Sequence, residues 1–210
     1  MMKVARIYVF GDSLVAGTYD SLGGWCDRLK QDMHKITAEA EDGTKRQLYN
    51  LGIGGENSRG LLQRIEQELA ARHSNSWPAV IIIGTGTNDS RLRDGMPEVE
   101  IEEYEQNLRS ILAVARKVTE KIILVGIGPC AEPEIPFKNY VYSHQRLVAY
   151  NDVLTRVASE LNIAKVEVYK LLSESTTTVH YRDGVHLSDH GYSLIHDAVK
   201  PVLLKMLEQD

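Results

Sequence analysis

The amino-acid sequence predicts a three-layer α/β/α fold built around a five-stranded parallel sheet. Two observations support this class. Five short runs of apolar, β-branched residues recur along the chain, with starts 32 to 44 residues apart. The segments between them carry apolar residues at helical spacing, and each is long enough for a helical crossover. Strands joined by helical crossovers form a parallel sheet covered on both faces.

The expected strands are residues 4–10, 47–51, 79–83, 121–125 and 165–169. Three of the intervening segments carry an apolar stripe typical of an amphipathic helix, the clearest of them over residues 99–118. The three stripes are Leu61, Leu62, Ile65 and Leu69; Ile101, Tyr104, Leu108, Ile111, Leu112 and Ala115; and Leu147, Tyr150, Leu154, Val157 and Leu161.

A last helix is expected to begin near Ser188, whose side chain suits an N-cap position. Pro201 lies inside this segment and lacks the N–H that a helix interior uses. The sequence therefore predicts a kink or a break near Val199 or Lys200.

Length and composition limit the possible classes of protein. A chain of 210 residues with 43% hydrophobic and 25% charged residues is expected to form one globular domain, residues 1–210, which excludes disordered and collagen-like proteins. The net charge of −5 argues against nucleic acid as a partner. No run approaches the ~18 apolar residues of a membrane span, so stable membrane insertion is not expected. Two cysteines without paired spacing fit a cytoplasmic protein, and the oligomeric state stays open.

The residues that follow the expected strands are rich in glycine, hydroxyl, carboxamide and carboxylate groups. In open α/β sheets, ligands bind outside the carboxyl ends of the strands. The four segments there are Gly11-Asp12-Ser13-Leu14, Asn50-Leu51-Gly52-Ile53-Gly54-Gly55, Gly84-Thr85-Gly86-Thr87-Asn88-Asp89 and Asp183-Gly184-Val185-His186. We expect them to meet at one edge of the sheet.

These residue types match the requirements of acyl transfer from an ester, which needs a nucleophile, a base, a group that orients the base, and donors for the oxyanion. Ser13 could attack a carbonyl, His186 could act as general base and acid, and Asp183, three residues earlier, could orient the imidazole. The backbone N–H groups of Ser13 and Gly55 and the side-chain NH₂ of Asn88 could form the oxyanion hole.

The four segments also resemble, in the same order, the four sequence blocks of the GDSL esterase/lipase, or SGNH hydrolase, family. They span residues 11 to 187. The resemblance implies a flavodoxin-like sheet of order 2-1-3-4-5, Ser13 as nucleophile, Asp183 and His186 as its triad partners, and no metal or organic cofactor. It also implies Gly55 and Asn88 as oxyanion donors.

The second block offers three glycines as the oxyanion donor, and the first block lacks the second glycine of a related motif. Gly52 and Gly54 compete with Gly55 for the donor role, and Gly55 is preferred because it precedes a polar helix start. The G-x-S-x-G elbow of ordinary α/β-hydrolases is absent, because Val15 stands where its second glycine would be.

Other readings of the same residues remain open. Ser13 alone would suit a helix N-cap, and the glycine turns would suit a non-catalytic flavodoxin-like module that binds a nucleotide or a phosphorylated small molecule. Asp183, His186 and His190 could be drawn as the ligands of a metal-dependent hydrolase. A small-molecule ester as substrate, cleaved through an acyl-enzyme, is the leading hypothesis.

Three segments are expected to wall the substrate pocket, namely residues 15–25, 91–97 and 127–143. The last of these contains three of the six prolines, and loops of this length are often functional. Trp25, Met96 and Phe137 are the expected substrate-binding side chains, which favour esters of short or medium acyl chains.

Overall fold

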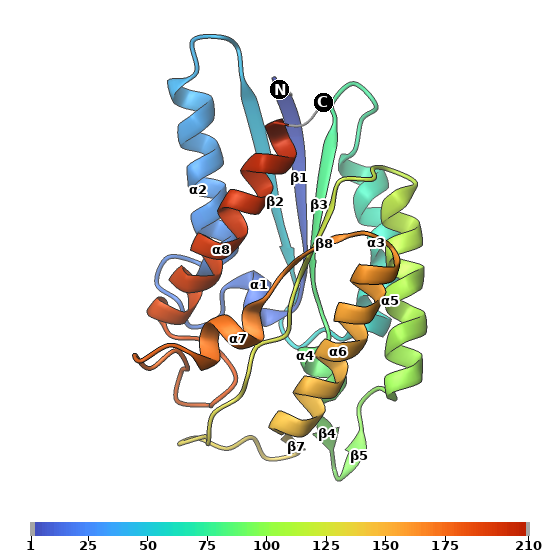
Figure 1. The fold of residues 1–210 in the computed structure, drawn as a ribbon, viewed down its shortest axis with the longest axis vertical. Helices are drawn as coiled ribbons and strands as arrows, with labels where there is room; N and C mark the ends of the chain where they lie inside the picture. Colours follow the sequence, from blue (N-terminus) through green and yellow to red (C-terminus); the bar gives the residue numbers. More distant parts are fainter. Residues whose placement is uncertain (1–2, 209–210) are drawn as a thin grey trace.

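The computed structural model describes residues 3–208 and contains the expected parallel sheet (Figure 1). Its strands are β1 (Val4–Gly11), β2 (Lys45–Gly52), β3 (Ala79–Gly84), β6 (Ile122–Val125) and β8 (Ala164–Val166). The order β2-β1-β3-β6-β8 is 2-1-3-4-5 when these strands are counted along the chain, and all neighbouring pairs are parallel. The predicted fold class and strand order are confirmed.

Five long helices cover the two faces of this sheet (Figure 1). One face packs against α2 (Gly24–Glu39) and α8 (Asp189–Glu208). The other packs against α3 (Ser58–Arg72), α5 (Ile101–Arg116) and α6 (His144–Glu160). The three apolar stripes seen in the sequence lie on α3, α5 and α6, and each faces the sheet.

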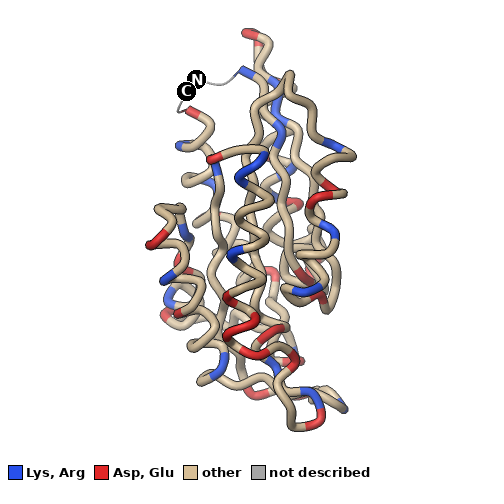
Figure 2. Tube along the Cα trace, turned by 90° about the vertical axis from the view of Figure 1, so that its right-hand side faces the viewer, with Lys and Arg blue, Asp and Glu red and all other residues tan. Residues whose placement is uncertain are grey.

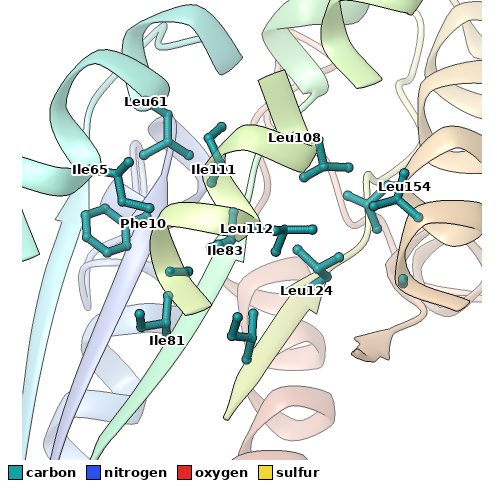
Figure 3. Packing of buried hydrophobic residues seen from close by; sticks show 14 of the residues in the cluster. Phe10, Leu61, Ile65, Ile81, Ile83, Leu108, Ile111, Leu112, Leu124 and Leu154 are labelled. Carbon is teal, nitrogen blue, oxygen red and sulfur yellow. The ribbon is translucent and has the colours of Figure 1, made fainter. Parts of the chain in front are cut away.

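Alternation along the strands divides the core into two parts, because successive side chains of a strand point to opposite faces. In β1, Ile7 and Val9 belong to the α2/α8 side, whereas Tyr8 and Phe10 belong to the other side. Figure 3 shows the second part, with side chains of the helices facing the strands; its labelled residues include Phe10, Ile83 and Leu124 from the sheet and Leu61, Ile65 and Leu112 from α3 and α5.

The structure differs from two expectations about the end of the chain. The fifth strand ends at Val166 instead of residue 169, because the short helix α7 (Val168–Ser173) begins there. Helix α8 continues without a break through Pro201. Both Pro201 and Asp197, whose carbonyl loses its intrahelical donor, are exposed, so water can satisfy that carbonyl.

A second, smaller sheet was not predicted. It is antiparallel with the order β5-β4-β7 and joins β4 (Leu92–Arg93), β5 (Met96–Pro97) and β7 (Tyr140–Val141). We call it the rim sheet, because it lies beyond the carboxyl ends of the parallel strands (Figure 1). It ties two of the three predicted pocket segments, residues 91–97 and 127–143, to each other.

Charged residues of both signs are mixed along the helices (Figure 2). Helix α5 has Glu102 and Glu103 in its first turn and Arg116 in its last, the arrangement favoured by the helix dipole.

Within residues 3–208, no helix is both long and apolar enough to cross a membrane.

Candidate active site

One residue, Asp12, separates Ser13 from the end of β1, and Ser13 is the first residue of the one-turn helix α1 (Ser13–Ala16). Asp12 caps this helix, since its Oδ1 accepts a hydrogen bond from the Leu14 N–H at 2.9 Å. The chain packs tightly here: a Cβ on Gly52 would lie 2.3 Å from the Ala16 nitrogen. Glycine at the end of β2 therefore lets α1, and with it Ser13, sit against the strand ends.

Ser13, His186 and Asp183 form one hydrogen-bonded row. The His186 Nε2 atom lies 2.8 Å from Ser13 Oγ, and its Nδ1 atom lies 2.6 Å from Asp183 Oδ2. Ser13 and His186 are 173 residues apart in the sequence. The fold thus brings together the three side chains that the sequence nominated.

The Asp183 carboxylate is itself held by the backbone. Its Oδ1 accepts hydrogen bonds from the N–H groups of Val185 at 3.0 Å and His186 at 2.9 Å, and the side chain is buried. These bonds leave Oδ2 for the imidazole. The spacing of three residues closes a tight turn in which the carboxylate reaches the near ring nitrogen of its neighbour.

An aromatic ring, that of Tyr19, also contacts the His186 imidazole. The Tyr19 ring meets the imidazole edge-on with a centroid separation of 5.1 Å, and Tyr19 stacks on Tyr181 at 4.2 Å. Tyr19 has a φ of +67°, which is unusual for a non-glycine residue. Sequence reasoning missed both tyrosines.

Asn88 lies on the one-turn helix α4 (Thr87–Ser90), which follows β3 as α1 follows β1. Its Nδ2 donates to the Glu56 carbonyl at 2.9 Å and to Asp12 Oδ2 at 3.3 Å. Its Oδ1 accepts from the Tyr142 hydroxyl at 2.8 Å and from Arg91 Nη1 at 3.0 Å. The carboxamide is thereby fixed at both ends.

The three candidate glycines of the second block differ in their surroundings. Gly52 is packed against α1, whereas Gly54 and Gly55 have open space where a Cβ would be and line the same cleft as Ser13. Gly55 has a φ of +76°, a conformation that favours glycine. The packing leaves Gly54 and Gly55 as the glycines beside the cleft.

Two buried carboxyl groups lie behind these residues. Burial raises the pKa of Asp12 to about 7 and that of Asp89 to about 6. Both Asp89 oxygens accept the Ser58 N–H at 3.0 Å, which anchors the start of α3. Asp89 has a structural role here, and Asp12 caps α1.

The cleft has a volume of about 210 Å³. It is lined by Ser13, Thr18, Gly54, Gly55, Asn88, Arg91, Phe137, Tyr140, Tyr142 and His186. Phe137 lies where the sequence analysis expected it. Trp25 does not line the cleft, because it is only 1% exposed and belongs to the core beneath α2, and Met96 is 68% exposed on the rim sheet.

The structure does not assemble the metal-ligand set considered above. His190 Nε2 lies 3.4 Å from Ser175 Oγ, on the exposed surface. The described part of the chain contains no group of three His, Cys, Asp or Glu side chains placed to hold a metal ion. Both ring nitrogens of His186 already contact side chains, those of Ser13 and Asp183.

The chain is similar to known lipases and esterases. A model of the GDSL-like Lipase/Acylhydrolase family matches residues 9–194. The esterase TesA of Pseudomonas aeruginosa is 27% identical, covering 96% of this chain and 89% of its own. The isoamyl acetate-hydrolyzing esterase of Saccharomyces cerevisiae is 25% identical, covering 99% and 87%.

Two solved structures are also similar to this chain. A crystal structure of TesA has a TM-score of 0.72 at 26% identity and covers 96% of this chain and 99% of that one. A lipolytic protein of the G-D-S-L family from Veillonella parvula has a TM-score of 0.72 at 20% identity, covering 96% of this chain and 99% of its own. The second likeness supports the fold.

Proposed function

Because the chain belongs to the GDSL-like lipase/acylhydrolase family and is a carboxylic ester hydrolase, we propose that it works through an acyl-enzyme formed on Ser13. The observation that carries this proposal is the row Asp183–His186–Ser13, with contacts of 2.6 and 2.8 Å. Nucleophile, base and orienting carboxylate are all within hydrogen-bond reach before any substrate is bound.

In the acylation step, His186 Nε2 takes the proton of the Ser13 hydroxyl while Oγ attacks the ester carbonyl carbon. The tetrahedral intermediate then collapses, the bond to the alcohol oxygen breaks, and His186 returns the proton to the leaving alcohol. In deacylation, His186 takes a proton from water while the water oxygen attacks the acyl carbonyl carbon. The bond from that carbon to Ser13 Oγ then breaks, the acid is released, and His186 returns the proton to Ser13.

Asp183 keeps the imidazole in the required tautomer. Its Oδ2 accepts the Nδ1 proton of His186, so the lone pair of Nε2 faces Ser13. Its other oxygen is occupied by two backbone N–H groups, which hold the carboxylate in place.

The oxyanion hole proposed here combines the N–H groups of Ser13 and Gly55 with the side-chain NH₂ of Asn88. Two facts support it. Ser13 begins a helix, where the first N–H groups have no intrahelical partner. Gly55 and Asn88 line the same cleft as Ser13.

We propose esters of short or medium acyl chains as the substrates. A cleft of about 210 Å³ with Phe137 and Tyr140 in its wall suits a small apolar group. The yeast relative, whose name specifies hydrolysis of isoamyl acetate, supports a small ester.

The experiment is a panel of p-nitrophenyl esters from acetate to palmitate, assayed with wild type and Ser13→Ala. We expect kcat/KM to peak at short or medium chains and Ser13→Ala to lose at least about 10⁴-fold in kcat. Ser110→Ala, which removes an exposed hydroxyl on α5, is the matched control and keeps wild-type rates. Equal rates for wild type and Ser13→Ala would refute Ser13 as nucleophile.

We further propose that the chain acts as one cytoplasmic catalytic domain on small molecules rather than on nucleic acid. Catalytic candidates lie near both ends of the sequence, and Cys26 and Cys130 are buried free thiols. The net charge of −5 also disfavours a phosphate backbone. Cell fractionation with activity assays tests the location.

A further inference from the structure

The carboxamide oxygen of Asn88 is held by two side-chain donors. Tyr142 Oη and Arg91 Nη1 lie 2.8 and 3.0 Å from its Oδ1. We propose that Arg91 and Tyr142 are positioning residues, which fix the oxygen end of the Asn88 carboxamide. Its NH₂, which in this structure donates to the Glu56 carbonyl at 2.9 Å and to Asp12 Oδ2 at 3.3 Å, can then donate to the oxyanion by giving up the longer bond to Asp12. This inference rests on the proposed function, in which Asn88 is an oxyanion donor.

The chemistry of the three groups fixes the direction of these bonds. A guanidinium has only donors, and a carboxamide oxygen has only acceptor sites, so Arg91 and Tyr142 both donate to Oδ1 of Asn88. If the carboxamide turned over, its NH₂ would face two donors and both bonds would be lost. Burial raises the pKa of Tyr142 to about 12, so its hydroxyl stays a donor at neutral pH.

Arg91 is held as a fixed donor and is not a free cation in the cleft. Its Nε donates to Glu98 Oε2 at 3.2 Å, and its guanidinium lies 4.8 Å from the centroid of the Tyr140 ring. The residue is only 6% exposed. Glu98 Oε2 also pairs with Arg93 at 2.7 Å, so its charge is shared between the two arginines. The burial of Arg91 and its fixed contacts favour a structural donor to Asn88 over a binding site for an anionic substrate.

Tyr142 reaches Asn88 because of the rim sheet. It follows β7, which pairs with β4 through Leu92–Val141 and Arg93–Tyr140. The two hydrogen-bonded residues, Tyr142 and Asn88, are 54 positions apart. The loop that forms one wall of the cleft thus also orients a donor of the oxyanion hole.

A polarising effect acts in the same direction. Two donors on Oδ1, one of them charged, draw electron density from the carboxamide and strengthen the hydrogen bonds that its NH₂ donates. The effect is larger in the transition state, when negative charge develops on the substrate oxygen. Loss of either donor should therefore lower kcat more than it changes KM.

The first test is Tyr142→Phe, which removes the hydroxyl and keeps the ring beside Phe137. We expect kcat on p-nitrophenyl acetate to fall about 5- to 10-fold, as for loss of one hydrogen bond, with KM within about twofold. The matched control is Tyr169→Phe, which removes a hydroxyl bonded to His144 outside the cleft and keeps wild-type kinetics. Wild-type kcat in Tyr142→Phe would overturn the inference.

The second test is a double-mutant cycle with Asn88→Ala, which alone should lower kcat by about 10²–10³-fold. If Tyr142 acts through Asn88, adding Tyr142→Phe to Asn88→Ala causes no further loss. The same 5- to 10-fold loss in both backgrounds would show that Tyr142 acts elsewhere. Arg91→Lys, which keeps the charge and loses the planar fork, should follow the same pattern.

The outcomes separate this inference from the function on which it rests. A wild-type protein without esterase activity would refute the proposed function itself. An active, Ser13-dependent enzyme in which the Tyr142 effect is absent, or independent of Asn88, would refute the positioning role alone.

Discussion

The two walls of the cleft are built differently. The catalytic wall (Ser13, Gly55, Asn88 and His186) is carried mainly by short turns at the ends of buried parallel strands. The rim wall (Arg91, Phe137, Tyr140 and Tyr142) lies on and beside strands of two residues, which carry exposed side chains such as Met96 and Val141.

This difference indicates a division of labour. Groups that must be placed to within a fraction of an ångström for catalysis stand on the rigid part of the fold. Groups that contact the variable part of the ester stand on a segment that can change without disturbing the core. Arg91 and Tyr142 are where the rim wall reaches across to the catalytic wall.

Asp183→Asn is expected to have the largest effect on the catalytic wall. Oδ1 of the new side chain would keep the two backbone N–H groups, which places its NH₂ against His186 Nδ1. The imidazole must then carry its proton on Nε2 and cannot accept the Ser13 proton. We expect kcat to fall by about 10³–10⁴-fold while the melting temperature stays close to wild type.

The measurement is steady-state hydrolysis of p-nitrophenyl acetate alongside thermal unfolding. A loss below about tenfold in a folded protein would contradict the orienting role of Asp183. It would also remove the distinction between the two walls.

The stability of the two regions should differ in the same sense. Leu112, on the face of α5 that packs against the sheet, is completely buried, whereas Met96 on the rim sheet is 68% exposed. We expect Leu112→Ala to lower the free energy of unfolding by about 2–5 kcal/mol. Met96→Ala, a comparable truncation, should change it by less than about 0.5 kcal/mol. Urea unfolding measures both, and equal losses would show that the rim sheet is as tightly packed as the core.

The pH dependence of stability probes the buried carboxyl behind the catalytic wall. Burial raises the pKa of Asp12 from 3.8 to about 7, so across this window the folded protein keeps a proton that the unfolded chain has released. The free energy of unfolding should therefore fall as pH rises from about 4 to 7. Asp12→Asn removes this contribution, on the order of 4 kcal/mol, and flattens the profile.

Urea unfolding at pH 4.5, 6.0 and 7.5 measures the slope. Part of it should persist in Asp12→Asn, because burial also raises the pKa of Asp89 to about 6. Asp152→Asn on the exposed face of α6 serves as the control. Identical slopes for wild type and Asp12→Asn would contradict a buried, proton-holding Asp12.

Truncation of Phe137 in the rim wall should have the smallest effect. Phe137→Ala removes an apolar ring from the cleft, so KM for p-nitrophenyl butyrate should rise about fivefold with little change in kcat. Met96→Ala, outside the cleft, should leave KM unchanged. A large fall in kcat for Phe137→Ala would show that this ring acts in the chemical step and not only in substrate binding.

Most of the parallel sheet was predictable because its strands are buried on both faces and appear as continuous apolar runs. The helices α3, α5 and α6 were predictable for a related reason, since each presents a single apolar stripe. The catalytic candidates could be found because parallel strands end at one edge, so residues far apart in sequence meet there.

The rim sheet could not be predicted, because strands of two residues have no period to detect. Tyr142 had no local pattern that connects it to Asn88, 54 residues away. The sequence analysis placed Trp25 in the pocket wall, although the spacing of the apolar residues around it indicated a core helix. Trp25, Cys26, Leu29 and Met33 are buried and share one face of α2, which marks a core helix rather than a pocket wall.

The most direct test of the central claim is labelling with a fluorophosphonate, followed by mass spectrometry of the peptides. The reagent forms a stable bond only with an activated nucleophile, and its phosphoryl oxygen occupies the place of the oxyanion. We predict one adduct, on Ser13, that is absent from Ser13→Ala and greatly slowed in His186→Ala. An adduct on another serine with Ser13 unmodified, or an unlabelled enzyme that still hydrolyses esters, would contradict the account.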